Sequence, residues 1–123
     1  MHPSRTTVLI VDDNEIIRLT LRSLLRSSGL EVIGEATDGV KGVAMAVQLR
    51  PDLICLDVLM PKMSGLEALA VIRTDLPSAK VLMVTGQADR ETIETAIGKG
   101  AHGIILKPFR QSQILDTIKR VLD

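Results

Sequence analysis

Three acidic residues directly follow apolar runs of the sequence. Asp12 and Asp13 come after the apolar residues 8–11, and Asp57 comes after residues 53–56. Taken alone, Asp12 and Asp13 could be turn residues or N-caps of a following helix. Asp57 is harder to explain in that way, because a carboxylate at the end of a buried run must be paired, hydrated or bound to a metal. The sequence therefore indicates a polar site with Asp57 at its centre.

A hydroxyl and an amine follow two later apolar runs. Thr85 comes after residues 81–84, and Lys107 comes after residues 103–106. Alone, Thr85 could cap a strand and Lys107 could neutralise the acids. Crowded carboxylates raise one another's proton affinity unless a cation shares their site. No Cys or His stands at the ends of these runs, so the oxygen ligands favour Mg²⁺ with several retained waters over zinc.

Together these residue types are the parts of a site that accepts a phosphoryl group. A carboxylate such as Asp57 is a weak nucleophile, but it can attack phosphorus when a metal ion and a fixed ammonium group neutralise the phosphoryl oxygens. Lys107 would supply the ammonium and Thr85 a hydroxyl donor. His2 and His102 stand near the N-terminus and in a turn, and we expect neither to be a ligand.

Five apolar runs alternate with five segments of helical periodicity. The runs cover residues 8–11, 31–36, 53–56, 81–84 and 103–106. They are short and separated by Gly or Pro, as buried strands are, and the segments between them have the apolar spacing of amphipathic helices. The pattern predicts an α/β fold, a (βα)₅ doubly wound parallel sheet of five strands. Its order is either Rossmann-like or flavodoxin-like, and in both the functional site lies beyond the carboxyl ends of the strands.

Length and charge narrow the class of protein. The 123 residues suit one domain. Lys plus Arg and Asp plus Glu both number 15, so no overall field steers the chain to nucleic acid or to an anionic membrane. Cys55, inside an apolar run, is predicted to be a small buried side chain. The sequence has no run of about 18 apolar residues and no signal peptide, and we expect a cytoplasmic protein without membrane insertion.

In their order and spacing, the motifs resemble those of the CheY-like receiver family of response regulators. The matching segments are VLIVDD at 8–13, PDLICLD at 51–57, MP at 60–61 with Gly65 beyond it, VTG at 84–86, and GAHG at 100–103 leading to KPF at 107–109. The resemblance covers nearly the whole chain. It implies the flavodoxin-like strand order 2-1-3-4-5. Because the last predicted helix ends with the chain, we expect one receiver domain over residues 1–123 and no output domain.

The resemblance also implies a role for each site residue. Asp57 would be the phosphoacceptor, and Thr85 and Lys107 would contact the phosphoryl oxygens. The Lys107–Pro108 peptide bond would be cis. The implied Mg²⁺ ligands are Asp13 and Asp57 directly, Asp12 through water, and Leu59 through its backbone carbonyl.

Two features depart from the usual pattern of that family. Ile104 stands where receivers often carry an aromatic switch residue, so a switch built on Thr85 and Ile104 would work without an aromatic flip. Leu59 and Gln87 stand where the family tunes the lifetime of the phosphoryl group. The resemblance implies the chemistry, and the sequence leaves its duration open.

The function implied is that of a signalling phosphoacceptor rather than an enzyme with a separate substrate. The donor would be a sensor histidine kinase or a histidine phosphotransfer protein, and a downstream protein would bind the face of the fourth helix, fifth strand and fifth helix.

The nearest alternative is a degenerate receiver that binds partners without phosphorylation. Haloacid-dehalogenase-like phosphatases need Asp-x-Asp after the first strand, and flavin sites need Ser, Thr and Gly there. Asp12-Asp13 supplies neither pattern. Direct nucleic-acid binding would need an output domain or a basic face; we expect no output domain, and the chain is neutral overall.

Overall fold

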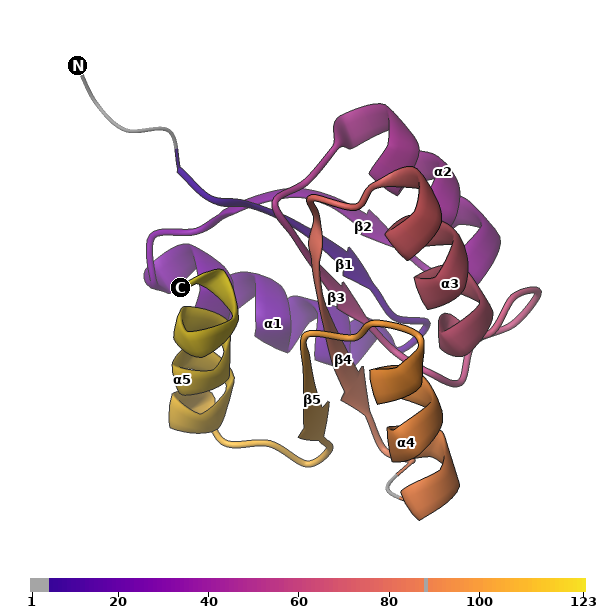
Figure 1. Cartoon of the computed structure of the whole chain (residues 1–123). Coiled ribbons are helices and arrows are strands. Elements are labelled where there is room, and N and C mark those ends of the chain that lie inside the picture. Colours follow the sequence, from indigo (N-terminus) through magenta and orange to yellow (C-terminus); the bar gives the residue numbers. More distant parts are fainter. Residues whose placement is uncertain (1–4, 88) are drawn as a thin grey trace.

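The computed structural model of the chain describes residues 5–87 and 89–123, and His2 lies outside this part. Strands and helices alternate throughout, as predicted (Figure 1). The elements are β1 (Thr7–Val11), α1 (Glu15–Ser27), β2 (Glu31–Ala36), α2 (Gly39–Leu49), β3 (Leu53–Leu56), α3 (Gly65–Asp75), β4 (Lys80–Thr85), α4 (Arg90–Gly98), β5 (Gly103–Leu106) and α5 (Gln111–Leu122). None of the helices in the described residues is both long enough and apolar enough to cross a membrane.

The five strands form one parallel sheet in the order β2-β1-β3-β4-β5. This order confirms the flavodoxin-like arrangement and excludes the Rossmann-like alternative. Val11 of β1 pairs with Leu56 of β3, so Asp12 and Asp57 leave the sheet at the same level. The register thus places both acids at one edge, as parallel strands require of residues that follow paired strand ends.

Helices cover both faces of the sheet, with α1 and α5 on one face and α2, α3 and α4 on the other (Figure 1). The strand residues alternate between two apolar cores, because successive side chains point to opposite faces. Leu9 and Ile54 pack into the core below α2, α3 and α4, whereas Ile10 and Cys55 pack into the core below α1 and α5. Burial raises the pKa of the Cys55 thiol to about 12, which agrees with its predicted structural role.

The strands are longer than the apolar runs at three places. β1 begins at Thr7, and β4 begins at Lys80 and ends at Thr85, because polar residues there still join the backbone ladder. Helix starts follow the expected chemistry, since the side chains of Asn14, Asp38 and Ser64 each accept a bond from a backbone N–H in the first turn. Asn14 is therefore the N-cap of α1, and Asp12 and Asp13 are left for another role.

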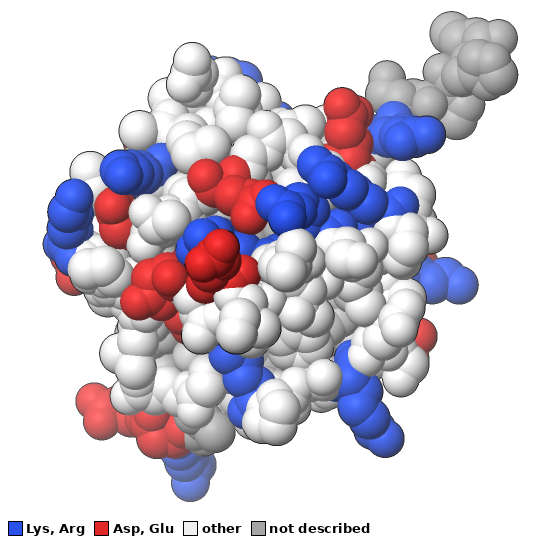
Figure 2. Space-filling view, turned by 180° about the vertical axis from the view of Figure 1, so that it is seen from behind, with Lys and Arg blue, Asp and Glu red and all other residues white. Residues whose placement is uncertain are grey.

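Basic and acidic side chains are interspersed on the face shown in Figure 2. No single sign of charge dominates that view. The picture agrees with the equal numbers of basic and acidic residues, 15 each. The face drawn in Figure 2 therefore shows no extended basic surface of the kind that binds nucleic acid.

Candidate functional site

Asp12 and Asp57 are buried just beyond the carboxyl ends of the neighbouring strands β1 and β3, with relative exposures of 2% and 6%. Their backbones are held by the sheet. The amide of Asp12 donates to the Ala36 carbonyl of β2 at 3.0 Å, and the amide of Asp57 donates to the Val11 carbonyl of β1 at 3.0 Å. The two carboxylates are therefore placed by rigid strands rather than by loops.

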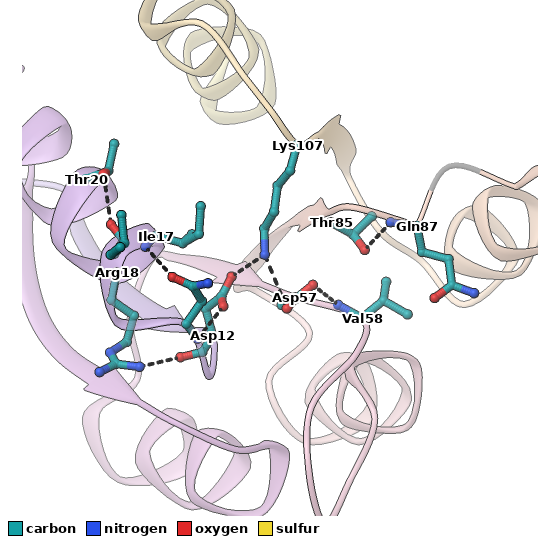
Figure 3. A network of polar contacts seen from close by, with 11 residues as sticks. Asp12, Ile17, Arg18, Thr20, Asp57, Val58, Thr85, Gln87 and Lys107 are labelled. Carbon is teal, nitrogen blue, oxygen red and sulfur yellow. Dashed lines mark hydrogen bonds and ion pairs between the residues drawn. The ribbon is translucent and has the colours of Figure 1, made fainter.

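Lys107, the residue directly after β5, bridges these two acids, as Figure 3 shows. Its Nζ lies 2.8 Å from Oδ2 of Asp12 and 3.3 Å from Oδ2 of Asp57. The backbone amide of Lys107 donates to the Thr85 carbonyl at 2.8 Å, which ties the lysine to the end of β4. The peptide bond between Lys107 and Pro108 is cis, as the resemblance implied.

Asp13 completes a group of three acids whose ligand oxygens all lie within 4.8 Å of one another. Unlike Asp12 and Asp57, Asp13 is exposed. Burial, and then the charge of Asp12, raise the pKa of Asp57 above its usual range, although Lys107 partly opposes this. Burial disfavours the charge of Lys107, but Asp12 and Asp57 together hold the pKa of Lys107 above its ordinary value.

The chemistry of this group suits a hard divalent cation. Its donors are carboxylate oxygens from Asp12, Asp13 and Asp57, and Mg²⁺ prefers such oxygens together with retained water. The Lys107 ammonium pairs with two of the three carboxylates, so a divalent ion would relieve the repulsion from Asp12 that adds to burial in raising the pKa of Asp57. The residues present fit the ion predicted from the sequence.

Thr85 is buried at the end of β4, with 2% relative exposure. Its Oγ1 accepts a hydrogen bond from the backbone amide of Gln87 at 3.1 Å. A threonine hydroxyl that accepts one bond still has its own hydrogen to donate. Through the backbone bond to Lys107, Thr85 belongs to the same end of the sheet as the acids.

The loop between β3 and α3 is packed tightly onto Asp57. The Asp57 carboxylate accepts from the Val58 amide at 2.8 Å, and the Gly65 amide donates to the Val58 carbonyl at 2.7 Å. A Cβ on Gly65 would overlap the backbone carbonyl of Asp57. Leu59 lies in this loop with an exposed side chain, and its predicted role as a carbonyl ligand stays a prediction.

Three contacts were not anticipated from the sequence. Arg18 donates to the Asp12 carbonyl at 2.9 Å and lies 3.5 Å from Glu35. His102 accepts a bond from the Val81 amide through Nδ1 at 3.0 Å. No motif marks Arg18 or Glu35, because their partners are determined by how α1 and β2 flank β1. His102 is far in sequence from Val81, so its acceptor role has no local signal.

Comparison with known proteins gives consistent matches over almost the whole chain. Residues 8–119 match the family model described as the response regulator receiver domain. A chemotaxis protein CheY of Listeria monocytogenes is 38% identical over 92% of this chain and 95% of its own length. The CheY-like receiver domain protein of Methanospirillum hungatei has a TM-score of 0.92 at 32% identity, covering 98% of this chain and 95% of that one.

A further solved structure is the CheX-CheY-BeF3-Mg+2 complex from Borrelia burgdorferi. The matching chain has a TM-score of 0.92 and 29% identity, over 95% of this chain and 89% of that one. That complex contains CheX as a protein partner together with Mg²⁺.

Proposed function

The chain belongs to the response regulator receiver domain family, and from that premise we propose that it is a phosphorylation switch in which Asp57 accepts the phosphoryl group. The observation that carries the proposal is the placement of Asp57 beside Lys107 and two further carboxylates. A degenerate receiver would be expected to lack one of these groups. All of them are present here, so the phosphorylation-independent alternative is the weaker hypothesis.

The donor that we propose is a phosphohistidine of a sensor histidine kinase or a histidine phosphotransfer protein. A carboxylate oxygen of Asp57 would bond to phosphorus while the bond from phosphorus to the histidine nitrogen breaks, and the departing imidazole would keep the electron pair. Lys107 already binds Asp57, so its ammonium can balance charge on the incoming oxygens. The free hydroxyl hydrogen of Thr85 can be donated to one of them.

For the metal we propose Mg²⁺, held by Asp13, Asp57 and the Leu59 carbonyl, with Asp12 acting through water. The bonds of Asp12 support its indirect role. Its Oδ1 accepts from the Asn14 amide at 2.9 Å and its Oδ2 from Lys107 at 2.8 Å, which leaves less capacity for direct coordination. When bound, the ion would neutralise charge on the phosphoryl group.

The output that we propose is a protein contact on the face of α4, β5 and α5. Ile97 of α4 and Leu106 of β5 are exposed apolar side chains there, with relative exposures of 61% and 37%. Thr85 and Ile104 would link this face to the site, since Ile104 packs partly buried against the core. Such signalling would take place in the cytoplasm, where we expect the kinase domain to act.

Acetyl phosphate with Mg²⁺ tests the proposal by intact mass spectrometry. We expect a gain of one phosphate that disappears in Asp57→Asn and in excess EDTA. Asp75→Asn is the matched control, because it makes the same change at an exposed position in α3 and should be labelled normally. Labelling that persists in Asp57→Asn would refute the assignment, and a folded wild-type protein without any labelling would favour the degenerate receiver.

A further inference from the structure

Arg18 joins the acidic site to the edge strand β2. It lies in α1, and its side chain is only 16% exposed. One guanidinium nitrogen donates to the backbone carbonyl of Asp12 at 2.9 Å, while Nε lies 3.5 Å from Oε1 of Glu35 (Figure 3 shows the bond to Asp12). The planar fork of arginine allows one side chain to hold both partners.

The carbonyl that Arg18 binds belongs to the peptide bond between Asp12 and Asp13. β1 ends at Val11, so this peptide lies just beyond the strand. The peptide group is planar, so a hydrogen bond that holds its carbonyl oxygen also fixes the direction in which the chain continues to the next residue. Arg18 therefore controls the backbone from which the exposed Asp13 carboxylate extends.

A simple ion pair with Glu35 does not account for this arrangement. Arg22, one turn later in α1, already binds the other oxygen of Glu35 at the shorter distance of 2.8 Å. The Arg22 side chain is also more exposed, at 34% against 16% for Arg18. Exposed pairs of this kind contribute little to stability. The feature that distinguishes Arg18 is the bond to the Asp12 carbonyl.

We propose that Arg18, anchored by Glu35, is a positioning residue that orients the Asp12–Asp13 peptide so that the Asp13 carboxylate can bind Mg²⁺. The inference rests on the proposed function, since it concerns the same metal site. Groups that orient metal ligands without touching the metal commonly change metal affinity by 10- to 100-fold when they are lost. Because the bond here acts through the backbone, we expect the lower end of that range.

A titration of the 123-residue chain with Mg²⁺ alone, monitored by calorimetry, tests the proposal. Arg18→Lys keeps the charge but loses the fork, and Arg18→Gln also removes the charge. We expect roughly ten-fold weaker Mg²⁺ affinity in both. Arg22→Lys is the matched control, because Arg22 binds Glu35 without binding Asp12, and its affinity should stay within about two-fold of wild type.

The sign of the Arg18→Gln effect separates positioning from electrostatics. If Arg18 acted only as a charge, its removal would strengthen binding of a cation. The amide signal of Asp13 in NMR spectra should shift in both Arg18 variants, while urea unfolding stays close to that of Arg22→Lys. Glu35→Gln should weaken Mg²⁺ binding by less than the Arg18 variants, because the carbonyl bond survives.

Wild-type affinity in Arg18→Lys, or equal losses in Arg18→Lys and Arg22→Lys, would overturn the positioning role. That result leaves the proposed function intact if the wild-type protein binds Mg²⁺ and takes up phosphate on Asp57. A wild-type protein that binds no Mg²⁺ would overturn the metal part of the proposed function and this inference together.

Discussion

The two ends of the parallel sheet use similar residue types for different purposes. At the amino end, the Asp52 carboxylate accepts from the Thr7 amide at 2.8 Å and from its hydroxyl at 3.1 Å. His102 accepts from the Val81 amide at 3.0 Å, and the His102 amide donates to the Val81 carbonyl at 2.8 Å. Polar side chains there close the backbone ladder where the strands begin.

At the carboxyl end, carboxylates face one another, although Asp12 and Asp57 each also accept a hydrogen bond from one backbone amide. One carboxylate oxygen from each of Asp12, Asp13 and Asp57 lies within 4.8 Å of the others, and Lys107 pairs with two of these acids. The comparison shows that an aspartate at a strand end stabilises the fold where hydrogen-bond donors surround it. Where other carboxylates lie close to it, the aspartate instead belongs to a group that could hold a cation. The predictions below test this contrast.

We expect the largest effect from a substitution that places a side-chain atom where Gly65 packs against the Asp57 carbonyl at the carboxyl end of the sheet. Gly65→Ala would push a Cβ into the Asp57 carbonyl, so the β3–α3 loop must move. We expect a loss of about 3 kcal/mol or more in the free energy of unfolding, in the upper range for an overpacked site. Urea denaturation measures the loss, and calorimetry should show weakened Mg²⁺ binding.

Gly98→Ala is the matched control, because an added Cβ at Gly98 meets open space at the end of α4. That variant should be neutral or more stable by up to about 1 kcal/mol, since alanine favours a helix over glycine. Similar behaviour of the two variants would mean that the loop tolerates the change and does not constrain Asp57.

The same substitution at the two ends should change stability in opposite directions. Asp52→Asn weakens the bonds to Thr7 and should lower the free energy of unfolding by about 1 kcal/mol. Asp13→Asn removes one of three crowded charges and should raise the free energy of unfolding of the metal-free protein by about 0.5 kcal/mol. Chemical denaturation in EDTA measures both changes.

Mg²⁺ should then reverse the ranking of these variants. A ligand that binds only the folded state stabilises it, so wild type and Asp52→Asn should gain stability in Mg²⁺, whereas Asp13→Asn should gain little. Destabilisation by both substitutions in EDTA would mean that the carboxyl end is as well satisfied as the amino end, and the contrast would fail.

The smallest effect concerns the response of the amino end to pH. Burial, followed by the charges of Arg73 and Lys80, lowers the pKa of His102 below its usual range. The unfolded chain then binds a proton near pH 6.5 while folded His102 stays neutral. Stability contributed by neutral His102 is complete above that pH and is lost as the pH falls through the lower, folded pKa.

Protonation would also abolish the acceptor for the Val81 amide, a bond worth about 1 kcal/mol. We therefore expect the free energy of unfolding to fall as the pH decreases below about 6.5, toward the lowered pKa of folded His102. His102→Asn offers an acceptor that does not titrate, and subtracting its pH profile from that of wild type isolates His102. Parallel profiles of the two proteins would rule out His102 as the source.

Much of the fold follows from local patterns in the sequence. Apolar runs of strand length, separated by helical periodicity and bounded by Gly and Pro, are sufficient to predict five strands and five helices. Residue type also indicates the chemistry, because Asp57, Thr85 and Lys107 each follow such a run. The exact ends were less predictable, since Thr7 and Lys80 join strands through backbone bonds that any side chain permits.

Resemblance to a family added what local patterns left open, including the strand order and the cis bond before Pro108. Residue periodicity alone left the Rossmann-like order possible. The apolar character of a strand indicates that it is buried but not which strands flank it. Only the register of β1 with β3 shows that Asp12 and Asp57 leave the sheet side by side.

The sequence by itself determined the elements of this protein and the residue types that follow its strands. Tertiary structure decided which of these residues meet: Lys107 with Asp12 and Asp57, Arg18 with the Asp12 carbonyl, and His102 with Val81. The physical reason is the distance along the sequence over which each kind of interaction acts. Backbone preferences and hydrophobic periodicity act over a few neighbouring residues, whereas these contacts join residues up to 95 positions apart, through strand pairing and helix packing that involve the whole chain.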